Sequence, residues 1–389
     1  MIKYVDFDFV PGADGVKVIR PLKIFFTKLF YYFLHSVELP EKGYARHFQF
    51  LEKSYIPLPP LPEQQRIVAK IEELFTKLDA GVEALKKAKE QIKRYRQAVL
   101  KYAFEGKLTE EWRVRANQER TNNVVGAIHE LPLQNGKKYK ELPPVNTSEL
   151  PELPEGWVWV RLGEVCEVTL GKTPNKSQYV NKGRYKIVKF RDVTNRGINY
   201  DEDERGFVIE NGKVISELVE LQERDILVTA SAHSSEHIGK KVVYVSKIPK
   251  RYEKVFFVGE LLCVRNRDNN IEPRTIYYYL MSQDGYKSIQ KHVRGVHLIT
   301  SEARQIPIPL PPLPEQQKIV EEIERRFSVV DEVEKAIDKS LKEAERLRQS
   351  ILKRAFEGKL VPQDPNDEPA EKLLERIKNR RAESRKGNS

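Results

Sequence analysis

Two long stretches of the chain share one pattern of apolar and polar positions. In residues 56–108 and again in 308–360, apolar side chains recur at alternating steps of four and three residues. A sustained period of about 3.5 residues is typical of a helix that packs one apolar seam along a partner helix. We therefore predict two long coiled-coil helices. The predicted seam residues are Ile67, Ile71, Leu74, Leu78, Leu85, Ile92 and Val99 in the first helix, and Ile319, Ile323, Val330, Val333, Ile337, Leu347 and Ile351 in the second.

The two stretches are copies of one unit. Aligned without a gap, 29 of their 53 positions are identical, which exceeds chance and indicates an internal duplication. Each copy opens with Ile-Pro-Leu-Pro-Pro-Leu-Pro-Glu-Gln-Gln, whose prolines favour an extended backbone that leads into a helix start. Gly106 and Gly358 follow the two helices and fit a helix stop.

The duplicated helices have two candidate partners. They could form a homodimer through generic coiled-coil packing, or they could pair with each other inside one chain and act as a rigid spacer. Weak seam positions such as Gly81 and Arg326 disfavour a symmetric zipper between identical helices. The duplication favours pairing within the chain, with the same surface presented to a partner at both ends.

Between the two copies the pattern changes to that of short strands. We predict a globular α+β domain over residues 155–306, preceded by a polar, proline-punctuated and flexible connector over residues 113–154. Alternating apolar residues predict strands at 157–162, 185–190, 225–229 and 241–245, and a helix is expected at 273–281.

Positive charge is concentrated within this domain. The chain has 68 Lys and Arg against 57 Asp and Glu, a net charge of +11, so nucleic acid is a natural partner. Basic runs supply salt-dependent affinity for DNA phosphates, and loops with Ser, His, Asn and Arg can contact base edges. The candidate DNA-binding residues are Lys172, Lys176, Lys186, Lys189, Arg191, Asn195, Arg196, Ser231, His233, Ser234, Lys240, Lys241, Arg294 and His297.

No catalytic or metal-binding motif accompanies the basic runs. Gly171-Lys172-Thr173 lacks the glycine that a phosphate loop needs five residues earlier, where the chain has Cys166. His233 and His237 have the spacing of a helical metal pair, but the glycine and serines around them favour a loop. We predict no catalytic residue, no metal ligand and no cofactor bound by this chain. A nucleotide-driven enzyme is disfavoured because the phosphate loop is absent.

The number of cysteines and the hydropathy indicate the cellular compartment in which the protein is expected. The two cysteines, Cys166 and Cys263, are too few for a disulfide scaffold or a four-cysteine zinc site. A disulfide between them and a reduced pair are both compatible with the sequence, and the reduced pair is the simpler interpretation. No apolar run reaches the roughly 18 residues that span a bilayer, so we expect a cytoplasmic protein without a membrane partner.

The repeated motifs resemble those of a known family. The proline-rich opening and Ala-Phe-Glu-Gly-Lys-Leu, each present twice, are similar to motifs of the specificity subunits of type I restriction–modification systems. The domain opening Pro154-Glu155-Gly156-Trp157, the segment Ile238-Gly239-Lys240 and the tail from Val361 to Pro369 match as well. The resemblance extends over nearly the whole chain.

The resemblance implies a fold and a set of partners. Members carry two target recognition domains, each for one half of a bipartite sequence in double-stranded DNA, and two helical regions that pack antiparallel and set their separation. It implies two modification (methyltransferase) subunits docked on this scaffold, together with restriction subunits. S-adenosylmethionine, ATP and Mg would belong to those partners, and the specificity subunit itself would catalyse nothing.

The duplication also predicts how the chain is divided. The first recognition domain would be represented only by a C-terminal remnant, so this copy may be compared with half-length specificity subunits that pair to restore two domains. The alternative function is therefore a half-type or non-recognising scaffold that binds modification subunits and needs a second copy through self-association. The predicted boundaries are a remnant at 1–55, a proline-rich segment and helix at 56–112, the connector at 113–154, the complete recognition domain at 155–306, the second helix at 307–360 and a charged tail at 361–389.

Overall fold

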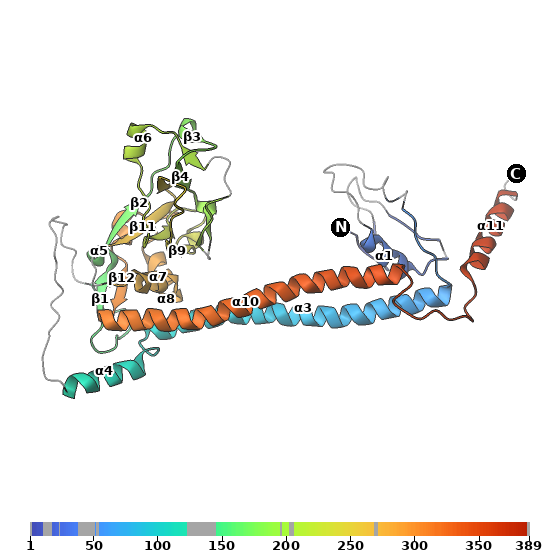
Figure 1. The fold of residues 1–389 in the computed structure, drawn as a ribbon, viewed down its shortest axis with the longest axis horizontal. Helices are drawn as coiled ribbons and strands as arrows, with labels where there is room; N and C mark the ends of the chain where they lie inside the picture. The colour runs from blue at the N-terminus through green and yellow to red at the C-terminus, as the bar shows by residue number, and fades with distance from the viewer. Residues whose placement is uncertain are drawn as a thin grey trace. The chain divides into compact units, whose positions relative to one another are not determined.

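The computed structural model divides the chain into two compact units. Residues 92–331 form the domain unit, and residues 1–91 together with 332–389 form the terminal unit. Two long helices, α3 (Leu61–Phe104) and α10 (Leu313–Phe356), each run through both units (Figure 1). The structure describes residues 2–10, 18–22, 24–37, 51, 54–122, 145–194, 197–201, 206–267 and 271–386.

The two long helices pair with each other, as the duplication predicts. In the terminal unit Lys89 Nζ lies 2.6 Å from Asp338 Oδ1, and Asp79 pairs with Arg348. In the domain unit Arg96 Nη2 lies 2.5 Å from an oxygen of the Asp331 carboxylate. As the residue numbers of the paired side chains increase along α3, those of their partners on α10 decrease, so the helices are antiparallel. Pairing within the chain is thereby confirmed.

The duplication repeats contacts as well as sequence. In the terminal unit the Arg348 guanidinium lies 4.3 Å from the centroid of the Phe75 ring. In the domain unit the Arg96 guanidinium lies 5.1 Å from the centroid of the Phe327 ring. Each arginine also makes one of the interhelical ion pairs described above, so the same group of an arginine, an aspartate and an aromatic ring occurs in both units.

The apolar seam is confirmed over most of its length, with two corrections. The side chains of Val333 and Leu347 are wrongly assigned to it, because they are 47% and 51% exposed. An α-helix has about 3.6 residues per turn, so its contact face rotates away from a strict 3.5-residue repeat. Leu352, at 2% exposure, is buried near the end of α10 instead. The remaining predicted seam residues are buried (Ile67, Ile71, Val99, Ile319, Ile323, Val330, Ile337 and Ile351) or half-buried (Leu74, Leu78, Leu85 and Ile92).

A short helix packs on the pair in the terminal unit. α1 (Thr27–Ser36) contributes Leu29, which is fully buried against Ile67, Ile71 and Ile351. The predicted charged tail contains a further helix, α11 (Ala370–Lys386).

Two four-stranded sheets form the core of the domain unit. One is antiparallel, and the other contains the parallel pair β10 and β4. The predicted strands and the predicted helix are confirmed to within a few residues. The first sheet has the order β2 (Cys166–Leu170), β11 (Leu261–Asn266), β8 (Ile226–Thr229) and β9 (Val242–Tyr244); the second has the order β10 (Lys254–Phe257), β4 (Tyr185–Val188), β7 (Phe207–Val208) and β3 (Tyr179–Val180).

The first sheet separates two apolar cores. Leu227 and Cys263 lie in a core with Phe256 of the second sheet. Their neighbours Val228 and Leu262 lie in the other core, which includes helix α7 (Pro273–Met281), helix α8 (Gln283–Lys291) and the ends of the long helices. This alternation follows from the two-residue period of side chains along a strand.

Both ends of the domain meet beside α10. β1 (Val158–Arg161) pairs antiparallel with β12 (Pro307–Leu310), with Val160 opposite Ile308. The second proline-rich segment is therefore extended, as predicted, and it forms a strand. The smaller elements are α5 (Leu162–Val165), η1 (Lys176–Gln178), η2 (Phe190–Asp192), β5 (Val193–Thr194), β6 (Gly197–Ile198), α6 (Gly212–Glu217), η3 (Ser235–His237) and α9 (Thr300–Ala303).

The predicted flexible connector is partly wrong. Its first residues belong to α4 (Glu110–Asn122), because they are mostly strong helix formers such as Glu, Arg, Ala and Gln. Its last residues pack on the domain, where Trp159 Nε1 donates a hydrogen bond to Pro151 O at 3.2 Å. Residues 123–144 lie outside the described residues.

The two cysteines are free thiols, and both are buried. Burial raises the pKa of Cys166 to about 12 and raises the pKa of Cys263. In the described part of the chain, no helix is both long and apolar enough to cross a membrane.

The helix pair predicts unequal effects of two substitutions in the terminal unit. Ile71→Ala removes a fully buried side chain and should cost about 2–5 kcal/mol of unfolding free energy through lost burial and a cavity. Leu347→Ala, at a half-exposed position of the predicted seam, should cost less than about 1 kcal/mol. Urea unfolding followed by circular dichroism measures both, and equal losses would contradict the observed seam.

Candidate nucleic-acid interface

Four loops of the domain unit join into one surface, here called the loop surface. They are residues 171–178, 189–194, 230–241 and 292–298. The third loop connects β8 to β9 and forms hydrogen bonds with the second and fourth loops, given below. Its link to the first loop is through Glu260, whose backbone oxygen accepts from Ala230 N and whose carboxylate accepts from Thr173 Oγ1. The folded domain therefore brings together most of the sequence-predicted DNA-binding residues.

Lys241 links the second and third loops. Its Nζ donates a hydrogen bond to Phe190 O at 3.2 Å and lies 4.0 Å from the centroid of the Phe190 ring. Burial lowers the pKa of Lys241, and the nearby Asp192 carboxylate opposes that effect. Lys189 and Arg191 flank Phe190 in the chain, and Lys189 Nζ lies 5.0 Å from the centroid of the Tyr179 ring.

Ser231 and His297 link the third and fourth loops. Ser231 Oγ and His297 Nδ1 are 2.9 Å apart, although the residues are 66 positions apart in the chain. The backbone at His297 also bridges to Ser231 and to Arg294. The Arg294 guanidinium is 3.0 Å from a Glu302 carboxylate oxygen and remains 61% exposed. Three residues that the sequence predicts to bind DNA, Ser231, Arg294 and His297, therefore lie next to one another.

Helix α8 fixes the far part of the third loop. Gln290 Nε2 donates hydrogen bonds to Ser235 O and Ile238 O, at 3.1 and 2.8 Å. Gly239 has a φ of +74°, and a Cβ there would lie 2.8 Å from a side-chain carbon of Ile289. The Ile238-Gly239-Lys240 motif is therefore explained by a left-handed turn packed tightly on α8.

The Gly171-Lys172-Thr173 segment is a packed turn. A Cβ at Gly171 would lie 2.2 Å from Val258 O, so only glycine fits there. Lys172 pairs with Glu217 at 2.7 Å, and Thr173 Oγ1 donates to a Glu260 carboxylate oxygen at 3.3 Å. These contacts agree with the prediction that the segment is no phosphate loop.

One predicted DNA-binding residue is corrected by the structure. Lys186 lies in β4 and is only 1% exposed, with its Nζ 5.1 Å from the centroid of the Phe207 ring. Its side chain belongs to the interior of the domain, because β4 lies between β10 and β7 and both of its faces are covered, so that Lys186, Ile187 and Val188 are all buried. Asn195 and Arg196 lie outside the described residues. The residues Lys172, Lys176, Arg191, His233 and Lys240 are exposed, and Lys189, Ser231, Ser234 and Lys241 are half-buried.

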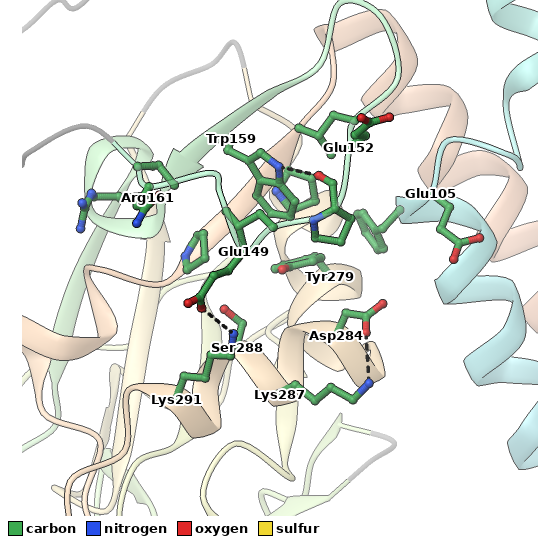
Figure 2. A pocket seen from close by; sticks show the side chains of 18 of the residues that line it. Glu105, Glu149, Glu152, Trp159, Arg161, Tyr279, Asp284, Lys287, Ser288 and Lys291 are labelled. Atoms are coloured by element: carbon green, nitrogen blue, oxygen red, sulfur yellow. Dashed lines mark hydrogen bonds and ion pairs between the residues drawn. The ribbon is translucent and has the colours of Figure 1, made fainter.

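A cavity of about 700 Å³ lies elsewhere in the same unit, where the segment 145–153 covers α8 and the end of α3 (Figure 2). Its charged walls pair internally: Lys287 is 3.6 Å from Asp284, and Lys291 is 4.0 Å from Glu149. No group of three potential metal-ligating side chains occurs anywhere in the described ranges. The sequence did not predict this cavity, because a third of its lining residues come from the predicted flexible connector.

The sequence also missed a buried junction at the start of α10. The Glu315 carboxylate, in a residue 2% exposed, accepts hydrogen bonds from Thr109 Oγ1 at 2.7 Å and from Trp157 Nε1 at 2.9 Å. It also pairs with Arg113 at 2.8 Å. This carboxylate thereby joins the end of α3, the start of α4 and the domain opening. The repeated Glu-Gln of the proline-rich motif was the available signal.

The match to known proteins agrees with this architecture. A family model described as the type I restriction modification DNA specificity domain matches residues 2–94 and 154–343. The chain belongs to this family. Each matched segment includes most of one long helix, and the second contains the whole loop surface.

Individual relatives of this specificity family are distant. The type I restriction enzyme EcoDI specificity subunit of Escherichia coli is 25% identical over 388 residues, which cover 94% of this chain and 79% of that protein. The EcoKI specificity subunit of Escherichia coli strain K12 is 28% identical over 343 residues, covering 85% of this chain and 64% of that protein. The chain therefore spans about two thirds to four fifths of the length of these specificity subunits.

One solved structure from a type I R-M system has the same fold. It comes from a study of the structural basis of complex assembly and conformational transition in that system. It aligns with a TM-score of 0.60 and 22% identity over 85% of this chain and 71% of that chain. This likeness supports the assignment of a mixed helix-and-sheet fold with two long helices.

The junction at Glu315 predicts different effects for the two tryptophans of the domain opening. Trp157→Phe removes a donor to a buried carboxylate and should lower the unfolding free energy by about 1.5–3 kcal/mol. Trp159→Phe removes a hydrogen bond to Pro151 O near the surface and should cost less than about 1 kcal/mol. Urea denaturation of both variants compares the losses, and a larger loss for Trp159→Phe would show that Glu315 does not anchor the domain.

Proposed function

We propose that this chain is the DNA sequence-recognition subunit of a type I restriction–modification complex. The domain at residues 155–306 is the recognising element in this proposal. The observation that supports it is the loop surface, in which hydrogen bonds join cations and polar side chains from three separate loops in a member of the specificity family.

The loop surface has groups suited to both kinds of DNA contact. Lys189, Arg191 and Lys241 offer positive charge to phosphates, which fixes position without selecting a sequence. Ser231, with its partner His297, offers short side chains that can donate to or accept from base edges. Their mutual hydrogen bond and the anchoring by α8 hold these groups in place before DNA arrives.

The helix pair serves as a scaffold in the same proposal. Two modification (methyltransferase) subunits would bind along α3 and α10, and restriction subunits would join that assembly. S-adenosylmethionine, ATP and Mg would be bound by those subunits, and this chain would carry out no catalytic step. The absence of a catalytic motif in the sequence supports the division of labour.

Phosphate contacts predict a change in salt dependence. The double variant Lys189→Ala with Arg191→Ala should weaken DNA binding and reduce the slope of log K against log salt by up to about 1.8, or about 0.9 per phosphate contact. Titrations of labelled duplex DNA at several salt concentrations, with the modification subunit present, measure this slope.

A matched control removes charge outside the domain. Lys335→Ala on α10 deletes an exposed cation that pairs with Glu332 in the same helix, and it should leave the salt slope unchanged. If wild-type protein binds all duplexes alike yet still binds modification subunits, the proposal fails and the non-recognising scaffold is favoured.

Base contacts predict a change in sequence preference. His297→Ala should cost about 1–3 kcal/mol against the preferred duplex and relax the preference at one base pair, with an unchanged salt slope. Selection from a randomised duplex library, compared with wild type, provides the measurement. An unchanged preference together with a reduced slope would assign His297 to the phosphate backbone.

A further inference from the structure

The helix α1 in the terminal unit is bound in the same way as α7 in the domain unit. Gln64 Oε1 accepts a hydrogen bond from Phe26 N at 2.7 Å, immediately before α1. Gln316 Oε1 accepts from Glu272 N at 2.9 Å, immediately before α7. The two glutamines occupy the same position of the duplicated motif, so the same type of hydrogen bond fixes the start of α1 and the start of α7.

Two further contacts repeat at these helices. The Tyr32 and Phe75 rings meet edge to face at 5.7 Å, and the Tyr278 and Phe327 rings do so at 5.9 Å. An ion pair joins each short helix to its long neighbour, Lys28 to Glu72 and Arg274 to Glu324. Residues 25–36 are therefore the structural counterpart of residues 271–282.

The surroundings of Glu63 differ from those of Glu315, which occupies the same position of the duplicated motif. Glu63 is 4% exposed, and in the described part of the chain no donor forms a hydrogen bond with its carboxylate. Glu315 is held by three residues, including Trp157 of the domain opening. The terminal unit thus repeats the glutamate of the duplicated motif without a described counterpart of the indole donor.

The extended segment before Glu63 shows the same difference. Tyr55–Leu58 corresponds to β12, whose Ile308 is fully buried beneath its pairing with β1. Tyr55 is 96% exposed, and the described residues provide no strand partner for its segment. An edge of backbone hydrogen-bonding groups is therefore available for an added strand.

The glycines that follow the long helices show a third difference. Gly106 and Gly358 have nearly equal φ angles, +71° and +70°. A Cβ on Gly106 would lie 2.2 Å from Pro154, which packs directly on it. At Gly358 the nearest atom is the side-chain nitrogen of Gln363, at 3.9 Å. Among the described residues of the terminal unit, none fills the space that Pro154 fills in the domain unit.

We propose that Glu63, Tyr55–Leu58 and Gly358 form a docking surface for an extended segment of a partner polypeptide with the chemistry of Pro154–Arg161. Such a segment packs a proline on Gly358, donates an indole N–H to Glu63 and adds a strand to Tyr55–Leu58. The chain itself shows this mode of binding, because Pro154–Arg161 occupies the corresponding surface of the domain unit.

The charges around Glu63 suit a neutral donor. Burial raises the pKa of the Glu63 carboxyl and the Asp367 carboxylate raises it further, while Arg66 opposes the shift. Arg66 itself pairs with Asp367 at 2.5 Å, so its charge is shared. An indole N–H satisfies a buried acceptor without adding a buried charge, whereas an acidic group would be repelled.

The experiment uses the full chain and a fluorescein-labelled peptide of residues 150–163. We expect saturable one-to-one binding by fluorescence anisotropy, weakened at least tenfold by Glu63→Ala. Glu73→Ala, an exposed carboxylate on the same helix, should bind like wild type. A peptide with Trp157→Phe should bind at least fivefold more weakly, because it keeps the ring and loses the N–H. No binding, or equal binding by both protein variants, overturns the proposal.

A cross-link separates the two duplicated surfaces. The same peptide, with a photoreactive residue in place of Trp157, should attach to residues 55–66. Attachment to residues 307–318 would mean that the peptide displaces the chain's own strand, and it would overturn the proposal. DNA is absent from both measurements, so failure here is distinct from failure of DNA recognition.

Discussion

The burial of one carboxylate determines how the domain is attached to the helix pair. Taking the Glu315 charge out of water costs several kcal/mol unless donors replace the lost hydration. Thr109, Arg113 and Trp157 supply those donors from three parts of the chain. Loss of any of them leaves a buried acceptor incompletely satisfied, so the end of α3, the start of α4 and the domain opening must stay together. The β1–β12 pair then closes both ends of the domain at the same place.

The loop surface depends on this attachment and on α8. Its loops are anchored in the two apolar cores by Val193, Ile238 and Leu298, and hydrogen bonds to neighbouring elements fix the rest. Gln290 of α8 binds the backbone of the third loop, and Lys241 of that loop binds the backbone of Phe190. The exposed side chains of loops fixed in this way can vary without loss of the fold, which suits the sequence recognition proposed for this domain.

Much of the fold follows from local sequence, and the exceptions have physical reasons. The period of about 3.5 residues predicted both long helices, and the duplication predicted their mutual pairing. Leu347 lies outside the seam because an α-helix has about 3.6 residues per turn, whereas the predicted seam assumes a repeat of 3.5 residues. Lys186 was assigned to the surface from its charge alone, although both faces of β4 are covered.

The candidate site was only partly predictable. The basic runs identified loops that the fold brings to one surface, since charge on a surface needs no distant partner. The pairing of Ser231 with His297 depends on a bridge between segments 66 residues apart, which no local pattern reports. The Glu315 junction was equally hidden, because its donors are separated from it by 158 to 206 positions in the chain.

The repeated arginine–aspartate–aromatic group has a consequence for mutagenesis. Arg96 meets Asp331 and Phe327, while Arg348 meets Asp79 and Phe75, so each helix offers the other the same residues that it receives. The duplication therefore supplies each helix with both sides of the contact, the arginine in one unit and the aspartate with the aromatic ring in the other. A change at one position of the repeated unit can be compared directly with the same change at its duplicate, because the same three residue types surround it.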